Sequence, residues 1–201
     1  MKLEVPFYKQ ESDDDCGPTA LRMALAFLDR DYSLDEIKKL MNINPKKGVS
    51  TIRIAITAAK FGYKTEFYST SLSFNKENLN LDFYKNYIGE SDVNESEQLV
   101  SEAKESGILL EERLLKLDEI LSKMSENSLP IILLDWNVIL SRKGYHGHFV
   151  PIDGYDDDFI YVHNQGSKDT KEYFQIKRDL FEKARKSQGT DEDILFIHRN
   201  I

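Results

Sequence analysis

The sequence predicts an α+β fold, with a helical first part at about residues 1–126 and a β-rich second part at about residues 127–201. Runs with helical periodicity dominate the first part, and apolar runs separated by turn signals dominate the second. This order differs from the regular strand–helix alternation of a parallel α/β fold. The chain has 201 residues, 40% of them hydrophobic, which is enough for one sizeable core. We therefore expect a single domain that covers residues 1–201.

Three helices are expected before residue 63. Residues 17–28 are apolar nearly all round, which predicts a buried central helix. Ser33 and Glu36 fit a capping box at the start of the second helix. In residues 50–61 the apolar side chains recur at i, i+3, i+4 and i+7, and Gly62 fits the end of that helix.

The rest of the chain adds further helices and most of the strands. Helical patterns lie within 74–106 and over 117–124 and 178–186. Strand patterns cover 63–68, 131–136, 149–153, 159–164, 173–176 and 194–198. The letters GYDDD, between the third and fourth of these strands, predict a hairpin turn.

The composition excludes several classes of protein. No apolar run approaches the roughly 18 residues of a membrane span, and the first residues lack the apolar region of a signal peptide. Cys16 is the only cysteine, which excludes an intrachain disulfide and a cysteine-rich zinc site. The 27 basic and 35 acidic residues give a net charge of −8 without a basic stripe, which argues against nucleic-acid binding. We expect a cytoplasmic protein without a nucleic-acid or membrane partner.

Cys16 precedes the central helix directly, and this position favours a nucleophile. The helix dipole and the free N–H groups of a first turn stabilise a thiolate. Gln10, six residues earlier, carries an amide that could donate to an oxyanion together with the Cys16 N–H. The alternative interpretation is that Cys16 is a small buried core residue.

The hairpin after residue 147 is expected to hold a histidine and an asparagine on one face. Four apolar residues at even positions must share that face: Val150, Ile152, Ile160 and Val162. If Gly154 pairs with Asp158, the paired residue numbers sum to 312 and His148 lies directly opposite Asn164. Sums of 310 or 314 keep the face but move the two side chains apart by a diagonal step.

Cys16, His148 and Asn164 follow one another in the order of a papain-type site. His148 comes 132 residues after Cys16, and Asn164 follows 16 residues later, which is close to the papain-type spacing of about 130–150 residues. The segments QESDDDCGPTALRMAL and GHFVPIDGYDDDFIYVHN resemble the peptidase C39-like family of the papain-like cysteine peptidase superfamily, in its free-standing cytoplasmic branch. The resemblance extends from Val5 to about Phe196.

The resemblance implies a papain-like cysteine peptidase fold, with the nucleophile on a central helix and an antiparallel β-sheet in the C-terminal half. It implies that Cys16 is the nucleophile, that His148 is the base and that Asn164 is the third member of the triad. It also implies that Gln10 is the glutamine of the oxyanion hole. The family needs no cofactor or metal, and its substrate is a peptide or protein.

One departure from the family pattern concerns the third member. The family has Asp-Pro where this chain has Asn164-Gln165. Asparagine can accept from the imidazole and fix its tautomer, but it cannot supply a negative charge. We nevertheless expect a Cys16 thiolate paired with a His148 imidazolium as the reactive form.

These observations favour a cysteine hydrolase that cleaves a peptide or amide bond through a Cys-His-Asn triad. The first alternative is a catalytically weak C39-like module that binds a peptide. The second starts from a related eukaryotic branch with a similar Asp-Cys-Gly block, which is named for guanylyl cyclase activity. That alternative ranks last because the sequence shows no phosphate-cradling glycine loop.

Three other histidines have to be weighed against His148. His146 competes with it for the role of base, but His148 adjoins the apolar run and faces Asn164. A metal site of Cys16 and two histidines lacks a recognisable fourth ligand. His163 faces away from Asn164, and His198 ends the last strand, so both are expected to be structural or exposed.

Two acidic segments admit a structural and a functional interpretation. Residues 90–126 contain four basic and eleven acidic residues, a net charge of 4 − 11 = −7. They are expected to form solvated faces of helices, and the alternative is that they form an acidic surface that binds a partner. Residues 13–15 are all aspartates; they form either a solvated loop or a rim that favours basic substrate residues.

Overall fold

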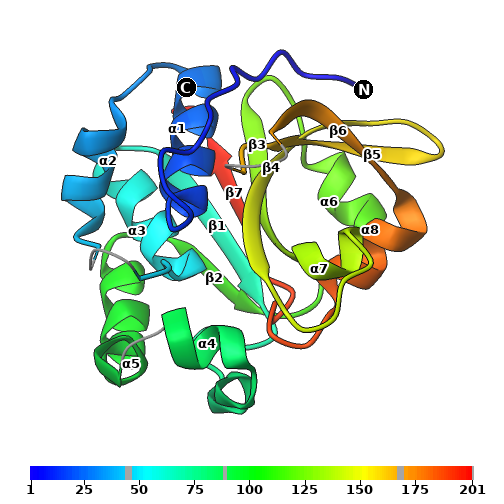
Figure 1. Cartoon of the computed structure of the whole chain (residues 1–201). Helices are drawn as coiled ribbons and strands as arrows, with labels where there is room; N and C mark the ends of the chain where they lie inside the picture. Colours follow the sequence, from blue (N-terminus) through cyan, green and yellow to red (C-terminus); the bar gives the residue numbers. More distant parts are fainter. Residues whose placement is uncertain (44–46, 88–89, 167–169, 201) are drawn as a thin grey trace.

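The computed structural model describes residues 1–43, 47–87, 90–166 and 170–200, and it shows one seven-stranded sheet with helices on both faces (Figure 1). The strands are β1 (Lys64–Ser69), β2 (Leu109–Glu112), β3 (Ser128–Asp135), β4 (Gly147–Tyr155), β5 (Phe159–Asn164), β6 (Lys171–Lys177) and β7 (Ile194–His198). Their order across the sheet is β2-β1-β7-β3-β4-β5-β6. All neighbours pair antiparallel except β1 and β2, which are parallel. The expected α+β class is confirmed.

The helices other than α7 occur where the periodic patterns predict them. They are α1 (Cys16–Leu28), α2 (Leu34–Met41), α3 (Thr51–Lys60), a 3₁₀ helix (Lys76–Asn80), α4 (Asp82–Tyr87), α5 (Glu90–Glu105), α6 (Leu117–Ser122), α7 (Trp136–Ile139) and α8 (Arg178–Arg185). Helices α1 and α3 pack against strands of the sheet from one side, and α8 packs against β3, β5 and β6 from the other (Figure 1). The capping box of Ser33 and Glu36 is present at the start of α2.

Helix α1 lies at the centre of the molecule because it is apolar nearly all round. Most of its side chains are buried in the core that it shares with β3 and β4. Gly17 lets the segment before α3 come close to the first turn, since a Cβ at this position would collide with the side chain of Val49. The first residue of α1 is thereby held between the sheet and the loop that leads into α3.

Two elements were not expected from the sequence. The short strand β2 has a mixed burial pattern and adds to the sheet parallel to β1. Helix α7 begins at Trp136, the last residue of the expected strand 131–136, because β3 already ends at Asp135. Within the described part of the chain, none of the helices has the length and apolar character needed to cross a membrane.

The expected register of the β4–β5 hairpin is wrong. Ile152 pairs with Val162, a sum of 314, and the next pair is Gly154 with Tyr161, so a β-bulge separates the two. The N-terminal segment explains the bulge, because Leu3 N–H donates to the carbonyl of Asp153 at 2.7 Å. A Cβ on Gly154 would lie only 2.8 Å from the carbonyl oxygen of Met1. His148 and Asn164 are therefore diagonal neighbours.

The turn of this hairpin is built by one aspartate. Asp156 Oδ1 accepts from the N–H groups of Asp158 and Phe159 at 2.9 and 2.7 Å. Its own N–H donates to the carbonyl of Phe159 at 3.0 Å. The GYDDD segment therefore forms the turn of the hairpin, as expected.

Candidate active site

Cys16 is the first residue of α1, and its side chain lines a cavity. The backbone N–H groups of Gly17 and Phe149 donate toward its sulfur. Phe149 follows His148 directly on β4. The start of α1 therefore lies beside the start of β4, where Phe149 contacts Cys16 and His148 is the preceding residue.

The surroundings of Cys16 favour the neutral thiol. Burial raises the pKa of Cys16 to about 11, and the negative charges of Asp15 and Asp14 act in the same direction. The N–H groups of Phe149 and Gly17 act in the opposite direction without cancelling the effect. At neutral pH the free site therefore holds a thiol.

His148 and Asn164 form the pair that the sequence predicts, although they are not directly opposite. His148 Nε2 lies 3.1 Å from Asn164 Oδ1, and both side chains are buried. The backbone N–H of Gly166 also donates to Asn164 Oδ1, at 3.1 Å. Because a backbone N–H can only donate, the accepting atom of Asn164 must be its oxygen, and His148 Nε2 must carry a proton. In the neutral ring Nδ1 is then the free base.

His148 is neutral in this environment. Burial, together with the neighbouring His146, lowers the pKa of His148 to about 4, against the opposing effect of the Asn164 hydrogen bond. The ring of Trp136 covers it edge to face at a centroid distance of 4.9 Å. These shifts favour a neutral thiol and a neutral imidazole as the resting form, whereas the sequence predicts a thiolate–imidazolium pair. The reason is that the site is buried and Asn164 brings no charge that would stabilise imidazolium.

Gln10 lies beside the same site but is engaged locally. Its side chain is buried, and Nε2 donates to the carbonyl of Ser12 at 2.9 Å. Its backbone N–H donates to the carbonyl of Gln165 at 3.0 Å. Nε2 carries a second N–H, which could donate to an oxyanion while the bond to Ser12 is kept.

Gln165 is a site residue that the sequence argument did not single out. Its buried Nε2 donates to the carbonyl of Cys16 at 3.1 Å and to the carbonyl of Phe149 at 2.5 Å. It thus joins the start of α1 to β4, next to Asn164 in the chain. The departure from Asp-Pro was the available signal, because a proline at position 165 could not make these contacts.

The other candidates have structural partners. Asp15 is buried and forms a salt bridge of 2.7 Å with Lys38. His146 is exposed, with its ring 5.4 Å from that of Phe83. His163 is buried on the opposite face, 2.8 Å from the carbonyl of Val5, as its orientation predicts.

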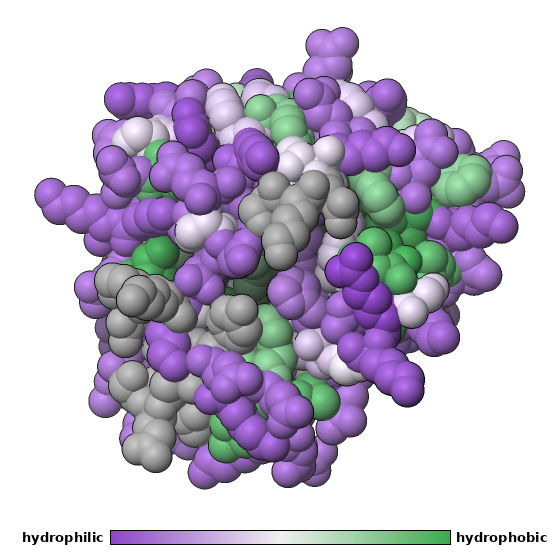
Figure 2. Space-filling view, in the orientation of Figure 1, coloured by the Kyte–Doolittle hydropathy of each residue, from purple (hydrophilic) through white to green (hydrophobic). Residues whose placement is uncertain are grey.

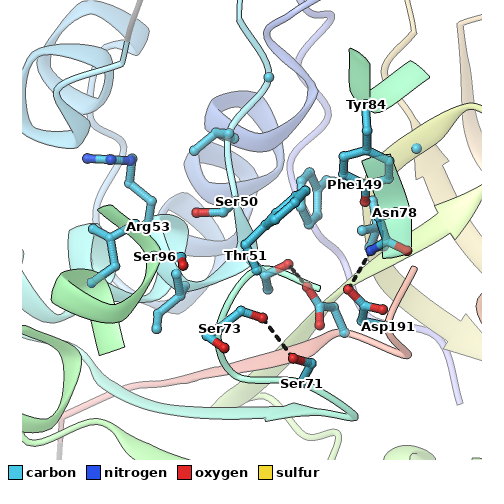
Figure 3. A pocket seen from close by; sticks show the side chains of 18 of the residues that line it. Ser50, Thr51, Arg53, Ser71, Ser73, Asn78, Tyr84, Ser96, Phe149 and Asp191 are labelled. Atoms are coloured by element: carbon cyan, nitrogen blue, oxygen red, sulfur yellow. Dashed lines mark hydrogen bonds between the residues drawn. The ribbon is translucent and has the colours of Figure 1, made fainter. Parts of the chain in front are cut away.

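A cavity of about 360 Å³ extends from Cys16 between the loop before α3, the loop after β1 and the loop before β7. Figure 3 shows Arg53 and Ser96 on one side of it, and Asn78, Tyr84 and Asp191 on the other. Phe149 projects into the view between them. Among the described residues, no group of three or more His, Cys, Asp or Glu side chains is placed to hold a metal ion.

A family model described as guanylylate cyclase matches residues 5–197, nearly the whole chain. The chain belongs to this family. It therefore falls in the group that the sequence argument ranked last among the functional alternatives.

A curated relative carries the same activity in its name. Guanylyl cyclase 1 of Arabidopsis thaliana is 29% identical over 215 residues, which cover 98% of this chain and 76% of the relative. The likeness extends beyond the short segments around the cysteine and the hairpin.

Solved structures similar to this guanylylate cyclase family member are peptidase domains. The peptidase domain of Streptococcus ComA, an ABC transporter, covers 96% of this chain with a TM-score of 0.53 and 13% identity, and 96% of that domain is covered. A double-glycine-motif protease of an AMS/PCAT transporter gives 0.55 and 15%, covering 98% of this chain and 94% of the other. A Bacillus anthracis protein described as C39-like gives 0.58 and 12%, covering 100% and 98%. At these identities the likeness shows the fold, and the fold is that of C39 peptidase domains.

Proposed function

We propose that this member of the guanylylate cyclase family is a cysteine hydrolase that cleaves a peptide or amide bond. The observation that carries the proposal is the bond from His148 Nε2 to Asn164 Oδ1, which leaves Nδ1 as the free base. The Cys16 sulfur meets the N–H of Phe149, the residue next to that base. The likeness of the fold to peptidase domains supports the proposal of a hydrolase.

Because the Cys16 thiol and the His148 imidazole are both neutral at rest, the thiol has to lose its proton during the attack. As the Cys16 sulfur attacks the carbonyl carbon, its proton passes to His148 Nδ1. The N–H of Cys16, in the first turn of α1, has no acceptor within the helix and is available to the developing oxyanion. The second N–H of the Gln10 amide can join it without loss of the bond to Ser12.

The second half of the reaction returns the site to its starting state. His148 gives its proton to the leaving amine as the carbon–nitrogen bond breaks, which leaves a thioester on Cys16. His148 then takes a proton from water as the water oxygen attacks the thioester carbonyl. Cleavage of the carbon–sulfur bond releases the acid and restores the thiol.

A peptide-library screen tests this proposal. Wild-type protein should cleave a subset of the peptides, and Cys16→Ala should cleave none of them. Cys16→Ser is the matched control for the shape of the site and should lose most of the activity because its hydroxyl is a weaker nucleophile. Equal cleavage by wild-type protein and Cys16→Ala would overturn the proposal.

A second candidate function is the formation of cyclic GMP from GTP. The family description and the name of the Arabidopsis thaliana relative favour it. Such a reaction joins the ribose 3′ oxygen to the α-phosphorus and releases pyrophosphate, and no thiol is required. We would incubate wild-type protein and Cys16→Ala with GTP and a divalent cation, and measure cyclic GMP by mass spectrometry. Equal product from both proteins would favour the cyclase, and no product from either would remove it.

A further inference from the structure

The cavity beside Cys16 has one end with unbalanced negative charge. Asp191 and Asp193, in the loop before β7, both line it. Asp191 accepts from the amides of Asn75 and Asn78 at 3.1 and 2.8 Å, and Asp193 accepts from the Thr51 hydroxyl. All three partners are neutral, so neither carboxyl group has a cationic partner within the described part of the chain.

The positive groups of the same cavity are already engaged. Arg53 pairs with Glu95 at 3.1 Å, and Lys47 Nζ donates to the carbonyl of Asn86 at the same distance. Figure 3 places Arg53 across the cavity from Asp191. The carboxyl end is therefore complementary to a cation that comes from outside the chain.

Asp193 has one carboxylate oxygen without a hydrogen-bond partner of normal geometry among the described residues, although the nearby Ser69 hydroxyl acts to lower the pKa of the group. Its Oδ1 is buried and lacks a hydrogen-bond partner, whereas Oδ2 takes the bond from Thr51. The backbone holds the residue in place, because Asp193 N–H donates to Thr190 at 3.0 Å and its carbonyl accepts from Leu133 at 3.2 Å. A buried carboxylate oxygen without a donor costs free energy that an incoming donor would recover.

The walls between Cys16 and this end are largely apolar. They include Val49, Leu72, Phe74, Leu133 and Phe149. A long side chain with a methylene stem and a charged end can place its stem against such walls and its head against the carboxyl groups. The volume of about 360 Å³ lies within the range of small-ligand pockets.

We propose that this cavity is a specificity subsite that takes a lysine or arginine side chain of the substrate, with Asp193 and Asp191 binding its cationic end. The proposal rests on the proposed function, since Cys16 would attack the carbonyl of the same substrate. It adds the class of peptide that is cleaved.

The pH dependence of this preference follows from the groups around Asp193. Burial raises the pKa of Asp193 to about 7, and the charge of Asp191 adds to the effect. The other titratable groups that face it are Tyr84 and Tyr145, whose pKa values are raised, so they stay neutral. Below pH 7 the protonated carboxyl group loses its charge, so the preference for a cation should weaken as the pH falls.

The experiment uses three peptidyl chloroacetamides that differ in one residue: lysine, uncharged norleucine or glutamate. The rate of Cys16 alkylation is measured for each by intact mass spectrometry and divided by the rate for iodoacetamide. We expect the lysine probe to exceed the norleucine probe at least about tenfold at pH 8, with the glutamate probe slowest. The lysine-to-norleucine ratio should fall several-fold at pH 5.5.

Two variants test whether Asp193 causes the preference for the lysine probe. Asp193→Asn should lower the lysine-to-norleucine ratio several-fold at pH 8, and Asp35→Asn, on the exposed side of α2, should keep the wild-type ratio. If Asp193→Asn does not fold, the pH dependence in wild-type protein still decides. Equal rates for lysine and norleucine at pH 8, with iodoacetamide reacting, would overturn the subsite. Failure of iodoacetamide to alkylate Cys16 at any pH would instead overturn the hydrolase proposal.

Discussion

Asn164 shows what a single residue contributes to the candidate site. The alternation of apolar residues predicts that it shares a face with His148, and the structure places the two side chains 3.1 Å apart. The proton position on the ring depends on Gly166, whose N–H bonds the same oxygen. No residue pattern signals this bond, because it depends on how the backbone continues after β5.

Asn164→Asp should change the charge state of the site. A carboxylate beside the ring favours imidazolium, so we expect the pKa of His148 to rise by at least about 1 from its value of about 4. NMR titration of the ring measures this directly. Asn164→Ala serves as the control, since it removes the hydrogen bond without adding charge and should not raise the pKa. An unchanged titration in Asn164→Asp would show that residue 164 does not set the state of His148.

The wild-type thiol should react slowly at neutral pH. Its pKa of about 11 lies above that of a free cysteine at about 8.5, so the thiolate fraction keeps rising into the alkaline range. We expect the iodoacetamide rate to increase about tenfold per pH unit up to about pH 10, whereas for a short cysteine peptide it should level off near pH 10. A plateau below pH 8 in the protein would contradict the neutral resting pair and restore the ion pair expected from the sequence.

For the strands, the sequence predicts which side chains share a face, but it does not predict the register between neighbouring strands. The even-numbered apolar residues predict which side chains share a face with His148 and Asn164, and all of these are buried, although β4 is buried on both faces. The bulge depends on the N-terminal segment beside β4, which lies about 150 residues away in the chain. Strand β2 escaped prediction because its four residues carry no clean alternation.

Gly154→Ala tests the contact that accompanies the bulge. The added Cβ would press on the carbonyl of Met1, so we expect a loss of about 1–3 kcal/mol in the free energy of unfolding. Urea denaturation measures it. Asp157→Ala, in the exposed turn of the same hairpin, should stay within about 0.5 kcal/mol of wild type. A loss no larger than that of the control would mean that the segments are not held together here.

Gln165→Leu tests the link between α1 and β4. The change removes the two hydrogen bonds that Gln165 Nε2 donates to the carbonyls of Cys16 and Phe149. We therefore expect urea denaturation to show a loss of about 1–3 kcal/mol in the free energy of unfolding. Gln175→Leu, on an exposed position of β6, is the matched control. We also expect slower peptide cleavage by Gln165→Leu at full substrate saturation. Unchanged stability and cleavage would reduce Gln165 to a passive core residue.

For the whole molecule, the sequence already indicates the class and the sites of most helices and strands. The face shown in Figure 2 is mostly hydrophilic, in keeping with the net charge of −8. In the acidic stretch 90–126, Glu95 and Glu102 of α5 pair with Arg53 and Lys60 of α3. Such pairs fit the interpretation as solvated helix faces, and an acidic partner surface stays a prediction.

For the whole chain, the description of the family differs from the descriptions of the solved structures that share its fold. Its family is described as guanylylate cyclase, whereas its fold is that of C39 peptidase domains. Residue patterns identify the fold because it depends on many apolar positions. The activity depends on a few atoms around Cys16 and on the substrate, which no pattern of apolar residues specifies.

The central claim is that Cys16 forms a covalent acyl intermediate. It is tested by mixing wild-type protein with a peptide found in the cleavage screen, quenching in acid and measuring the intact mass. We predict an adduct with the mass of the acyl half of the peptide on Cys16, absent in Cys16→Ala and formed at least about a hundredfold more slowly in His148→Ala. Peptide cleavage without an adduct at Cys16, or cleavage by Cys16→Ala at the wild-type rate, would contradict the account.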